Sequence, residues 1–359
     1  MPPVPINDRS QPVRVNIPHL NNFDLLRFSF AAIVFLVHAY RLTGNDDLAF
    51  FSRFLSSDLA VECFFVVSGF LIFMSYEYSP TLRTYFEKRV RRIYPAYFVV
   101  VVLCAVLGAM VSEHAFSAYF LSPDLYRYLA ANLVFLNFLH PTLPGVFVEN
   151  PLVAVNGALW TLKIEVMFYL SVPLLVWFFR KIGLWQGLSL AYLASCAYFY
   201  LMSVAAARHG GVYVELQRQL PGQLMYFIAG GALYYYFDSL MNYWKWLLLA
   251  AIAFFLIEYA YHPGMFDAAM VGIGVVYLAC KFPYMGNFGK YGDFSYGVYI
   301  LHFPILQVFV ALHLFDGASF SPMLLATVLV LSSACLMWHG VEKPMLNKSS
   351  HYVAVNRRP

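Results

Sequence analysis

The sequence predicts an all-α membrane protein, a polytopic helix bundle with about ten transmembrane helices. Of its 359 residues, 61% are hydrophobic and only 12% are charged, whereas soluble domains carry roughly 25% charged residues. Apolar runs of about 17 to 22 residues recur along the chain, and each is long enough to cross a hydrocarbon core. The weaker, alternating pattern of a membrane β-barrel is absent. Composition therefore excludes a soluble protein.

Ten apolar runs, taken in order, give the expected spans. The first is the stretch FDLLRFSFAAIVFLVHAY, the second contains VECFFVVSGFLIF, the third follows a basic block, and GALWTLKIEVMFYL opens the fourth. The later runs are recognised by apolar length alone. The expected spans cover residues 24–42, 59–76, 95–112, 158–179, 184–206, 219–237, 244–261, 265–281, 294–315 and 321–341.

Charge distribution predicts the orientation. If the N-terminus is cytoplasmic, roughly 17 Lys and Arg residues lie inside and about 5 outside, as the positive-inside rule requires. Both termini are then cytoplasmic, and the long loop at 112–157 is outside, either on the membrane surface or folded over a cavity. We expect a cytoplasmic tail at 1–22, a membrane domain at 23–344 and a second tail at 345–359.

Several classes of ligand are not expected. The net charge of +4 resides mostly in short loops, so it indicates topology and not binding to nucleic acid. The five cysteines are scattered through apolar runs without a CxxC or CxxH spacing, which argues against disulfides and against a metal site.

The first span carries two ionisable residues, Arg27 and His38. A charged group in hydrocarbon costs about 2.5–3.5 kcal/mol on insertion scales, so such residues usually face a bundle interior or a wet cavity. Eleven residues at 100° each place both side chains on one helix face, about 17 Å apart along the axis. This spacing suits a long thin ligand with an anionic head at Arg27 and a reactive end at His38. The alternative is that Arg27 snorkels to lipid phosphate and His38 is a hydrogen-bonded core residue.

The block YFEKRVRRIYPAYF places a dense cationic patch just cytoplasmic to the third span. Its arginines, Arg89, Arg91 and Arg92, offer the bidentate geometry that binds phosphates. The alternative is an ordinary positive-inside anchor or a site for anionic lipid.

Two further segments place carboxylates at the outer ends of spans. Trp160, Thr161 and Glu165 open the fourth span, and Thr161 and Glu165 share a helix face at a depth similar to His38. Glu62 lies near the outer end of the second span. A carboxylate there can orient an imidazole or bind a sugar hydroxyl, or it can belong to an ion pair that only holds helices together.

The last segments, DFSYGVYILHFPIL and HGVEKP, add polar residues to the ninth and tenth spans. Tyr296, Tyr299 and His302 fall on one stripe, and Glu342 lies near the cytoplasmic end of the last span. All four are candidates to support a site, although core residues with satisfied hydrogen bonds are the commoner case.

Taken together, these segments resemble acyltransferase family 3, the bacterial multi-span membrane O-acyltransferases. The arginine-x10-histidine pattern of that family matches Arg27 and His38. Its other blocks are similar to AVECFFVVSGFLI, KRVRRIYP, WTLKIEVMFY, SYGVYILHFP and the late EKP, in the same order along nearly the whole chain. Thr161 stands where the family usually has serine, and its hydroxyl can serve equally.

The resemblance implies an acyl-CoA-dependent O-acetyltransferase of the bacterial inner membrane, with acetyl-CoA as co-substrate and no permanently bound cofactor. The acceptor would be a hydroxyl of a surface polysaccharide or its lipid-linked precursor, such as O-antigen or exopolysaccharide. His38 would act as general base or acyl carrier, with Glu165 and Glu62 positioning it or the acceptor. The CoA phosphates would bind Arg27, Arg89, Arg91 and Arg92. Trp160, Thr161, Tyr296, Tyr299, His302 and Glu342 would support the acceptor side.

Two other functions compete with this one. A transporter or exporter of a glycan-like or acylated solute would use the charged interior as a path, but it would be expected to show broken helices and an internal repeat. A purely structural membrane protein is disfavoured by the cost of so many buried ionisable groups.

Overall fold

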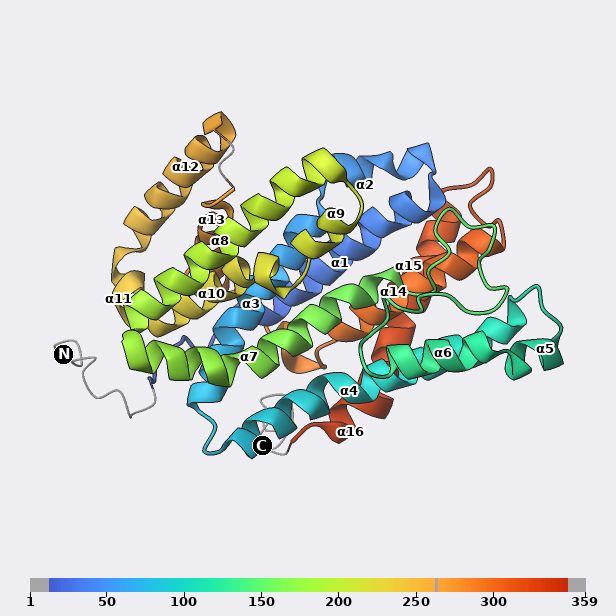
Figure 1. The fold of residues 1–359 in the computed structure, drawn as a ribbon, viewed down its shortest axis with the longest axis horizontal. Helices are drawn as coiled ribbons and strands as arrows, with labels where there is room; N and C mark the ends of the chain where they lie inside the picture. Colours follow the sequence, from blue (N-terminus) through green and yellow to red (C-terminus); the bar gives the residue numbers. More distant parts are fainter. Residues whose placement is uncertain (1–12, 262–263, 348–359) are drawn as a thin grey trace. The chain divides into compact units, whose positions relative to one another are not determined.

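The computed structural model describes residues 13–261 and 264–347, and these residues fold almost entirely into helices (Figure 1). Within them there is no strand, only one isolated bridge between Ser112 and Val146. The all-α class is confirmed. Most of the tails predicted at 1–22 and 345–359 lies outside the described residues.

A helix is found at each of the ten predicted spans. Seven of these helices are long and apolar enough to cross a membrane: α1 (Phe23–Thr43), α3 (Ser57–Glu77), α4 (Leu82–Leu107), α7 (Trp160–Ile182), α8 (Leu184–His209), α12 (Trp244–Tyr261) and α15 (Phe320–Met337). The expected start of the third span at residue 95 differs from the structure. There α4 begins at Leu82 and runs through the basic block, so Pro95 lies inside the helix.

The other three helices are shorter. They are α10 (Leu220–Tyr235, 16 residues), α13 (Asp267–Cys280, 14 residues) and α14 (Ser295–Ala311, 17 residues). At 1.5 Å per residue they reach roughly 21 to 26 Å, less than the roughly 30 Å of a hydrocarbon core. The count of ten crossings and the cytoplasmic placement of both termini remain predictions.

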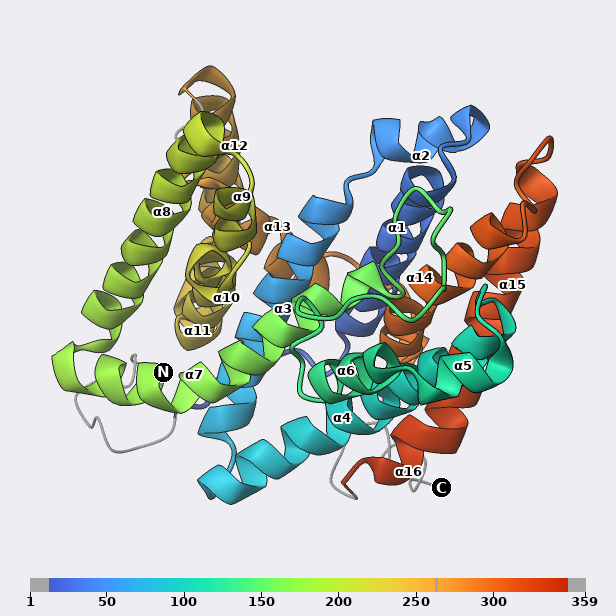
Figure 2. The ribbon, with the colours of Figure 1, turned by 45° about the vertical axis from the view of Figure 1, so that its right-hand side comes forward.

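The chain divides into two compact units that alternate along the sequence. The first unit comprises residues 1–23, 62–86 and 164–284. Within it α8 packs against α10, α10 against α13 and α13 against α12 (Figure 2). Glycines bring α3 and α10 together, because a Cβ on Gly69 would lie 2.0 Å from the carbonyl oxygen of Phe227, and one on Gly230 2.1 Å from that of Val66. Small residues permit such close approach of membrane helices.

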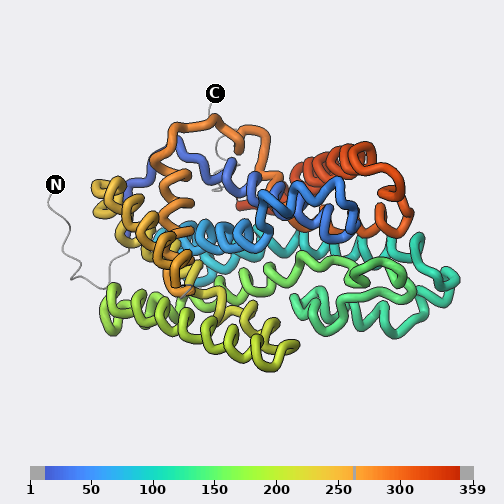
Figure 3. The backbone as a smooth tube through the Cα atoms, turned by 90° about the horizontal axis from the view of Figure 1, so that it is seen from above, coloured from blue at the N-terminus to red at the C-terminus, as the bar shows by residue number. Residues whose placement is uncertain are grey.

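The second unit comprises residues 24–61, 87–163 and 285–359. It contains nearly all of α1, most of α4, the helices α5 (Phe116–Leu121) and α6 (Pro123–Asn132) of the long loop, and the C-terminal pair of α14 and α15. In that pair α14 packs closely against α15, as Figure 3 shows. A Cβ on Gly297 would lie 2.9 Å from Ala334. After α15 the chain continues as a π-helical turn, η6 (Trp338–Glu342), and then as α16 (Lys343–Met345), the last helix of the described residues.

Candidate functional site

The arginines predicted to bind phosphate meet an acid that was not among the predicted site residues. Arg27 of α1 and Arg92 of α4 both donate to one oxygen of Asp293, just before α14. The second carboxylate oxygen of Asp293 accepts from the Ser295 hydroxyl and backbone N–H. Asp293 is buried, with a side chain 2% exposed. Four segments of the second unit are therefore tied together, because Arg92 also bonds Glu342 of η6 at 3.3 Å.

The electrostatics of this cluster follow from its charges. Burial alone would raise the pKa of Asp293, but the guanidinium groups of Arg27 and Arg92, helped by Ser295, outweigh burial and hold that pKa well below its usual range. The Trp338 ring faces Arg92, with the guanidinium carbon 5.6 Å from the ring centroid. Both guanidinium groups contact the Asp293 carboxylate and Arg92 also contacts Glu342, so a phosphate would share the arginines with these acids.

The other two arginines of the block lie differently. Arg89 is half-buried, whereas Arg91 is exposed and pairs with Glu87 at 3.0 Å, one helical turn away. Exposed pairs of this kind contribute only about 0.3–0.5 kcal/mol. The Arg91 guanidinium can therefore turn toward a ligand at little cost.

His38 and His302, which both belong to the second unit, form a direct pair. Nδ1 of His38 lies 2.8 Å from Nε2 of His302, and the rings are stacked with centroids 5.1 Å apart. Nδ1 of His302 lies 3.2 Å from the carbonyl oxygen of Val298, which only accepts, so this nitrogen carries a proton. With both imidazoles neutral, Nε2 of His302 accepts and Nδ1 of His38 donates. The tautomer that results leaves Nε2 of His38 unprotonated, as a general base requires.

The neighbouring tyrosines and threonine hold α14 against the start of α7. The hydroxyls of Thr161 and Tyr299 are 2.7 Å apart, and both residues are buried. The Tyr296 hydroxyl donates to the carbonyl oxygen of Ile93 in α4 at 3.0 Å. Asn156 donates to the carbonyl oxygen of Ile300 at 2.8 Å. Thr161, Tyr296 and Tyr299 thus position His302, while Trp160 is half-buried at the first position of α7.

The two predicted supporting carboxylates belong to the first unit. Glu165 accepts from Tyr169, four residues later on α7, and from Ser68 of α3 at 3.5 Å. Glu62 is half-buried on α3. Their predicted action on His38, which belongs to the second unit, stays a prediction.

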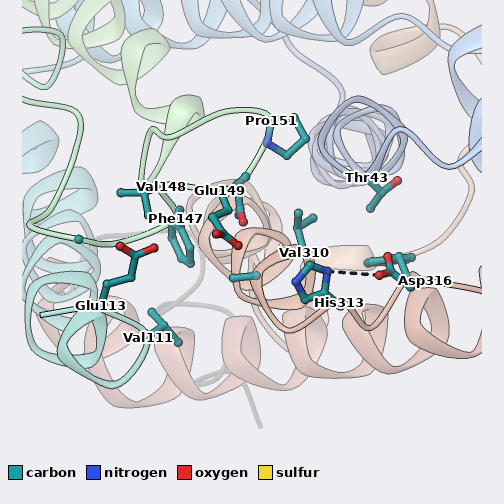
Figure 4. Close-up of a pocket in the computed structure, with 14 residues that line it drawn as sticks. Thr43, Val111, Glu113, Phe147, Val148, Glu149, Pro151, Val310, His313 and Asp316 are labelled. Carbon is teal, nitrogen blue, oxygen red and sulfur yellow. Dashed lines mark ion pairs between the residues drawn. The ribbon is translucent and has the colours of Figure 1, made fainter.

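A pocket lies beyond the histidine pair, at the C-terminal ends of α1 and α14. Its volume is about 380 Å³, and it is lined by Thr43, the loop at 145–151 and the turn at 310–316. Figure 4 shows Glu149 between Glu113 on one side and His313 with Asp316 on the other. His313 and Asp316 pair at 3.2 Å. Part of the long loop therefore lines this pocket.

Ordered contacts hold this loop in place. The Ser112 hydroxyl donates to the carbonyl oxygen of Pro144 at 2.7 Å, and Asn150 donates to the side-chain oxygen of Gln307 at 2.9 Å. Asp293 and the acids of this pocket were not among the predicted site residues. Asp293 follows a glycine and directly precedes an apolar run. In a chain with an arginine-rich block, an acid at such a position could have been predicted to pair with the arginines. The acids of the pocket stand in a loop without periodicity and gave no comparable signal.

Comparisons with known proteins agree with the resemblance seen in the sequence. A family model described as an acyltransferase domain matches residues 20–339. An O-acetyl transferase of Shigella phage Sf6 is 27% identical over 354 residues, which cover 92% of this chain and 97% of the relative. Nodulation protein 10 of Rhizobium leguminosarum bv. viciae is 27% identical over 364 residues, covering 94% and 96%. No solved structure matches this chain.

Proposed function

Because this chain belongs to acyltransferase family 3, we propose that it transfers an acetyl group from cytoplasmic acetyl-CoA to a hydroxyl of a carbohydrate acceptor outside the bacterial inner membrane. The observation that carries the proposal is the contact of His38 with His302 at 2.8 Å, which leaves Nε2 of His38 ready to accept a proton. The relative that is named an O-acetyl transferase supports ester formation as the reaction.

The chemistry begins with a sugar hydroxyl, a poor nucleophile near neutral pH. Nε2 of His38 takes the hydroxyl proton while the oxygen attacks the thioester carbonyl carbon, and a C–O bond forms. The tetrahedral intermediate then collapses, the C–S bond breaks, and the CoA sulfur leaves with the proton held by His38. The products are the acetyl ester and CoA. A positioned general base of this kind contributes typically about 10²–10⁴-fold in rate.

The helix α1 sets the distances between the two substrates. Arg27 lies eleven residues before His38, about 17 Å along the axis, and Thr43 lies five residues after it, about 7.5 Å. The anionic part of the donor would bind at Arg27, Arg89, Arg91 and Arg92, and its thioester would reach His38. The acceptor would enter through the pocket that Thr43 borders.

Charge in that pocket favours one class of acceptor. Glu113, Glu149 and Asp316 border it, and His313 is paired with Asp316. Carboxylates accept hydrogen bonds from sugar hydroxyls and repel anionic sugars. A neutral or cationic sugar therefore fits the pocket better than a uronic acid.

The test is transfer of labelled acetyl from acetyl-CoA to glycan and lipid fractions of membranes that contain the chain. We expect His38→Gln to lose transfer by about 10²-fold or more. His209→Gln is the matched control, because His209 is exposed at the end of α8. Full transfer by a folded His38→Gln variant would overturn the role of His38. If wild-type membranes supplied with glycan precursors showed no transfer, the proposed function would be wrong.

The same assay separates direct transfer from an acyl-histidine. Wild-type protein is incubated with labelled acetyl-CoA without acceptor and then denatured. Direct transfer leaves no label on the chain, whereas an acyl carrier leaves label that disappears in His38→Gln.

A further inference from the structure

A second pocket of the second unit lies at the N-terminal end of α1. Its volume is about 340 Å³. It is lined by Asp24 and Phe28 of α1 and by the segment 287–294, which leads into α14. The chemistry proposed above gives this pocket, called here the aromatic pocket, no occupant. We infer that it binds the adenine base of the acyl-CoA donor, an inference that rests on the proposed function.

Four aromatic rings line the aromatic pocket: Phe28, Phe288, Tyr291 and Phe294. The rings of Phe28 and Phe288 are 6.3 Å apart and tilted by 41°. Phe288 is 48% exposed and Tyr291 70% exposed, so both have ring surface open to a ligand. A nucleobase stacks on such surfaces, and each stacked ring is worth roughly 1–3 kcal/mol.

The backbone keeps these rings out of the core. Phe288 begins a single 3₁₀ turn, η5 (Phe288–Lys290), between two glycines with positive φ, Gly286 at 108° and Gly292 at 140°. A Cβ at Gly292 would lie 2.1 Å from the Trp338 indole nitrogen, so only glycine fits there. The segment is thus pressed against η6 at Gly292, and its aromatic side chains remain at the pocket.

Polar groups at the edge of the aromatic pocket match the edge of adenine. The Asp24 carboxylate accepts hydrogen bonds, as binding of an exocyclic amino group requires, and the Asn287 amide both donates and accepts. Asp293 borders the same pocket and holds Arg27 and Arg92 beside it. A base in the pocket would therefore have its phosphates next to these arginines.

The position of the aromatic pocket on α1 fixes the direction of the donor. Phe28 lies ten residues before His38, about 15 Å along the helix axis. Base and thioester would lie at opposite ends of this stretch, with the phosphates near Arg27. The competing explanation is that these aromatic rings only anchor the protein at the membrane interface. In that case the rings would not distinguish donors with and without a nucleotide.

The experiment compares acetyl-CoA with acetyl-pantetheine, which lacks the nucleotide, in transfer by purified full-length protein. For Phe288→Leu and Tyr291→Leu we expect the KM for acetyl-CoA to rise about tenfold, because each variant loses one ring on which the base would stack. The KM for acetyl-pantetheine should stay unchanged. Phe320→Leu is the matched control, because Phe320 is as exposed as Tyr291, at 72%, but begins α15 and does not line the aromatic pocket.

A binding measurement keeps this inference separate from the proposed function. The probe is 3′,5′-ADP, the nucleotide part of CoA, titrated into wild type, Phe288→Leu and Phe320→Leu. Weaker binding to Phe288→Leu alone supports the base site even if no transfer is found. No binding to wild type, equal binding to all three proteins, or equal KM changes for both donors would overturn the inference. If the wild-type protein transferred acetyl from neither donor, the proposed function would be refuted instead.

Discussion

Replacing Asp293 by asparagine tests whether the cluster of Arg27, Arg92, Asp293 and Glu342 is held by charge. The substitution keeps the size of the side chain but removes the charge that Arg27 and Arg92 share. Removing one partner of a buried ion pair costs roughly 3–5 kcal/mol. Arg27 and Arg92 keep some contact with water, with side chains 20% and 13% exposed, so we expect about 3 kcal/mol, the lower end of that range.

Adding a second substitution distinguishes an effect of charge from an effect of lost packing, because the two change the free energy of unfolding in opposite directions. Asp293→Asn leaves the two guanidinium groups without the carboxylate that they share, and adding Arg27→Gln removes one of these cations. The double variant should therefore be more stable than Asp293→Asn alone, by about 1 kcal/mol or more, within the usual range of coupling energies. The free energy of unfolding is measured in mixed micelles by loss of helical circular dichroism.

The contribution of Asp293 to the free energy of unfolding depends on pH in a definite direction. Because the folded pKa of Asp293 lies below its unfolded value, its contribution is fully present above about pH 4 and is lost as pH falls through the folded pKa. The difference in free energy of unfolding between wild type and Asp293→Asn should therefore narrow as the pH falls below about 4.

The control for this series is Asp58→Asn. Asp58 pairs with Arg41 at 3.5 Å, with side chains 65% and 49% exposed, so the change should stay within about 0.5 kcal/mol. The reasoning fails if Asp293→Asn is no more harmful than Asp58→Asn, or if adding Arg27→Gln destabilises the protein further.

Three other predictions concern the histidine pair and the packing. His302→Gln should lower kcat about 10-fold or more and leave the KM for acetyl-CoA within twofold, because only the tautomer of His38 is affected; steady-state kinetics checks this. Thr161→Val should cost about 1–3 kcal/mol by leaving the Tyr299 hydroxyl without its 2.7 Å partner, and adding Tyr299→Phe should recover part of the loss in unfolding assays. Gly69→Ala should lower the free energy of unfolding by about 1–3 kcal/mol, because the added methyl group would overlap the backbone of Phe227. Gly274→Ala should not lower it, because there is open space around Gly274.

The membrane class and the approximate positions of ten helices were predictable from the sequence. Apolar length and composition are local properties, and the ten expected spans correspond to helices in the structure. The common face of Arg27 and His38 is equally local, because it follows from 3.6 residues per turn. The basic block showed where α4 is cationic, but it did not show that the helix begins before that block.

The partners of these residues were decided by tertiary structure. His38 meets His302 across 264 residues of sequence, and Arg27 meets Asp293 across 266. Both contacts depend on the register and rotation of α14 relative to α1, which arise from packing such as the close approach of Gly297 to Ala334. The aromatic pocket likewise needs the turn at 288–290 to lie beside α1. A sequence fixes which face of a helix is polar, whereas only the packed bundle determines which other helix that face meets.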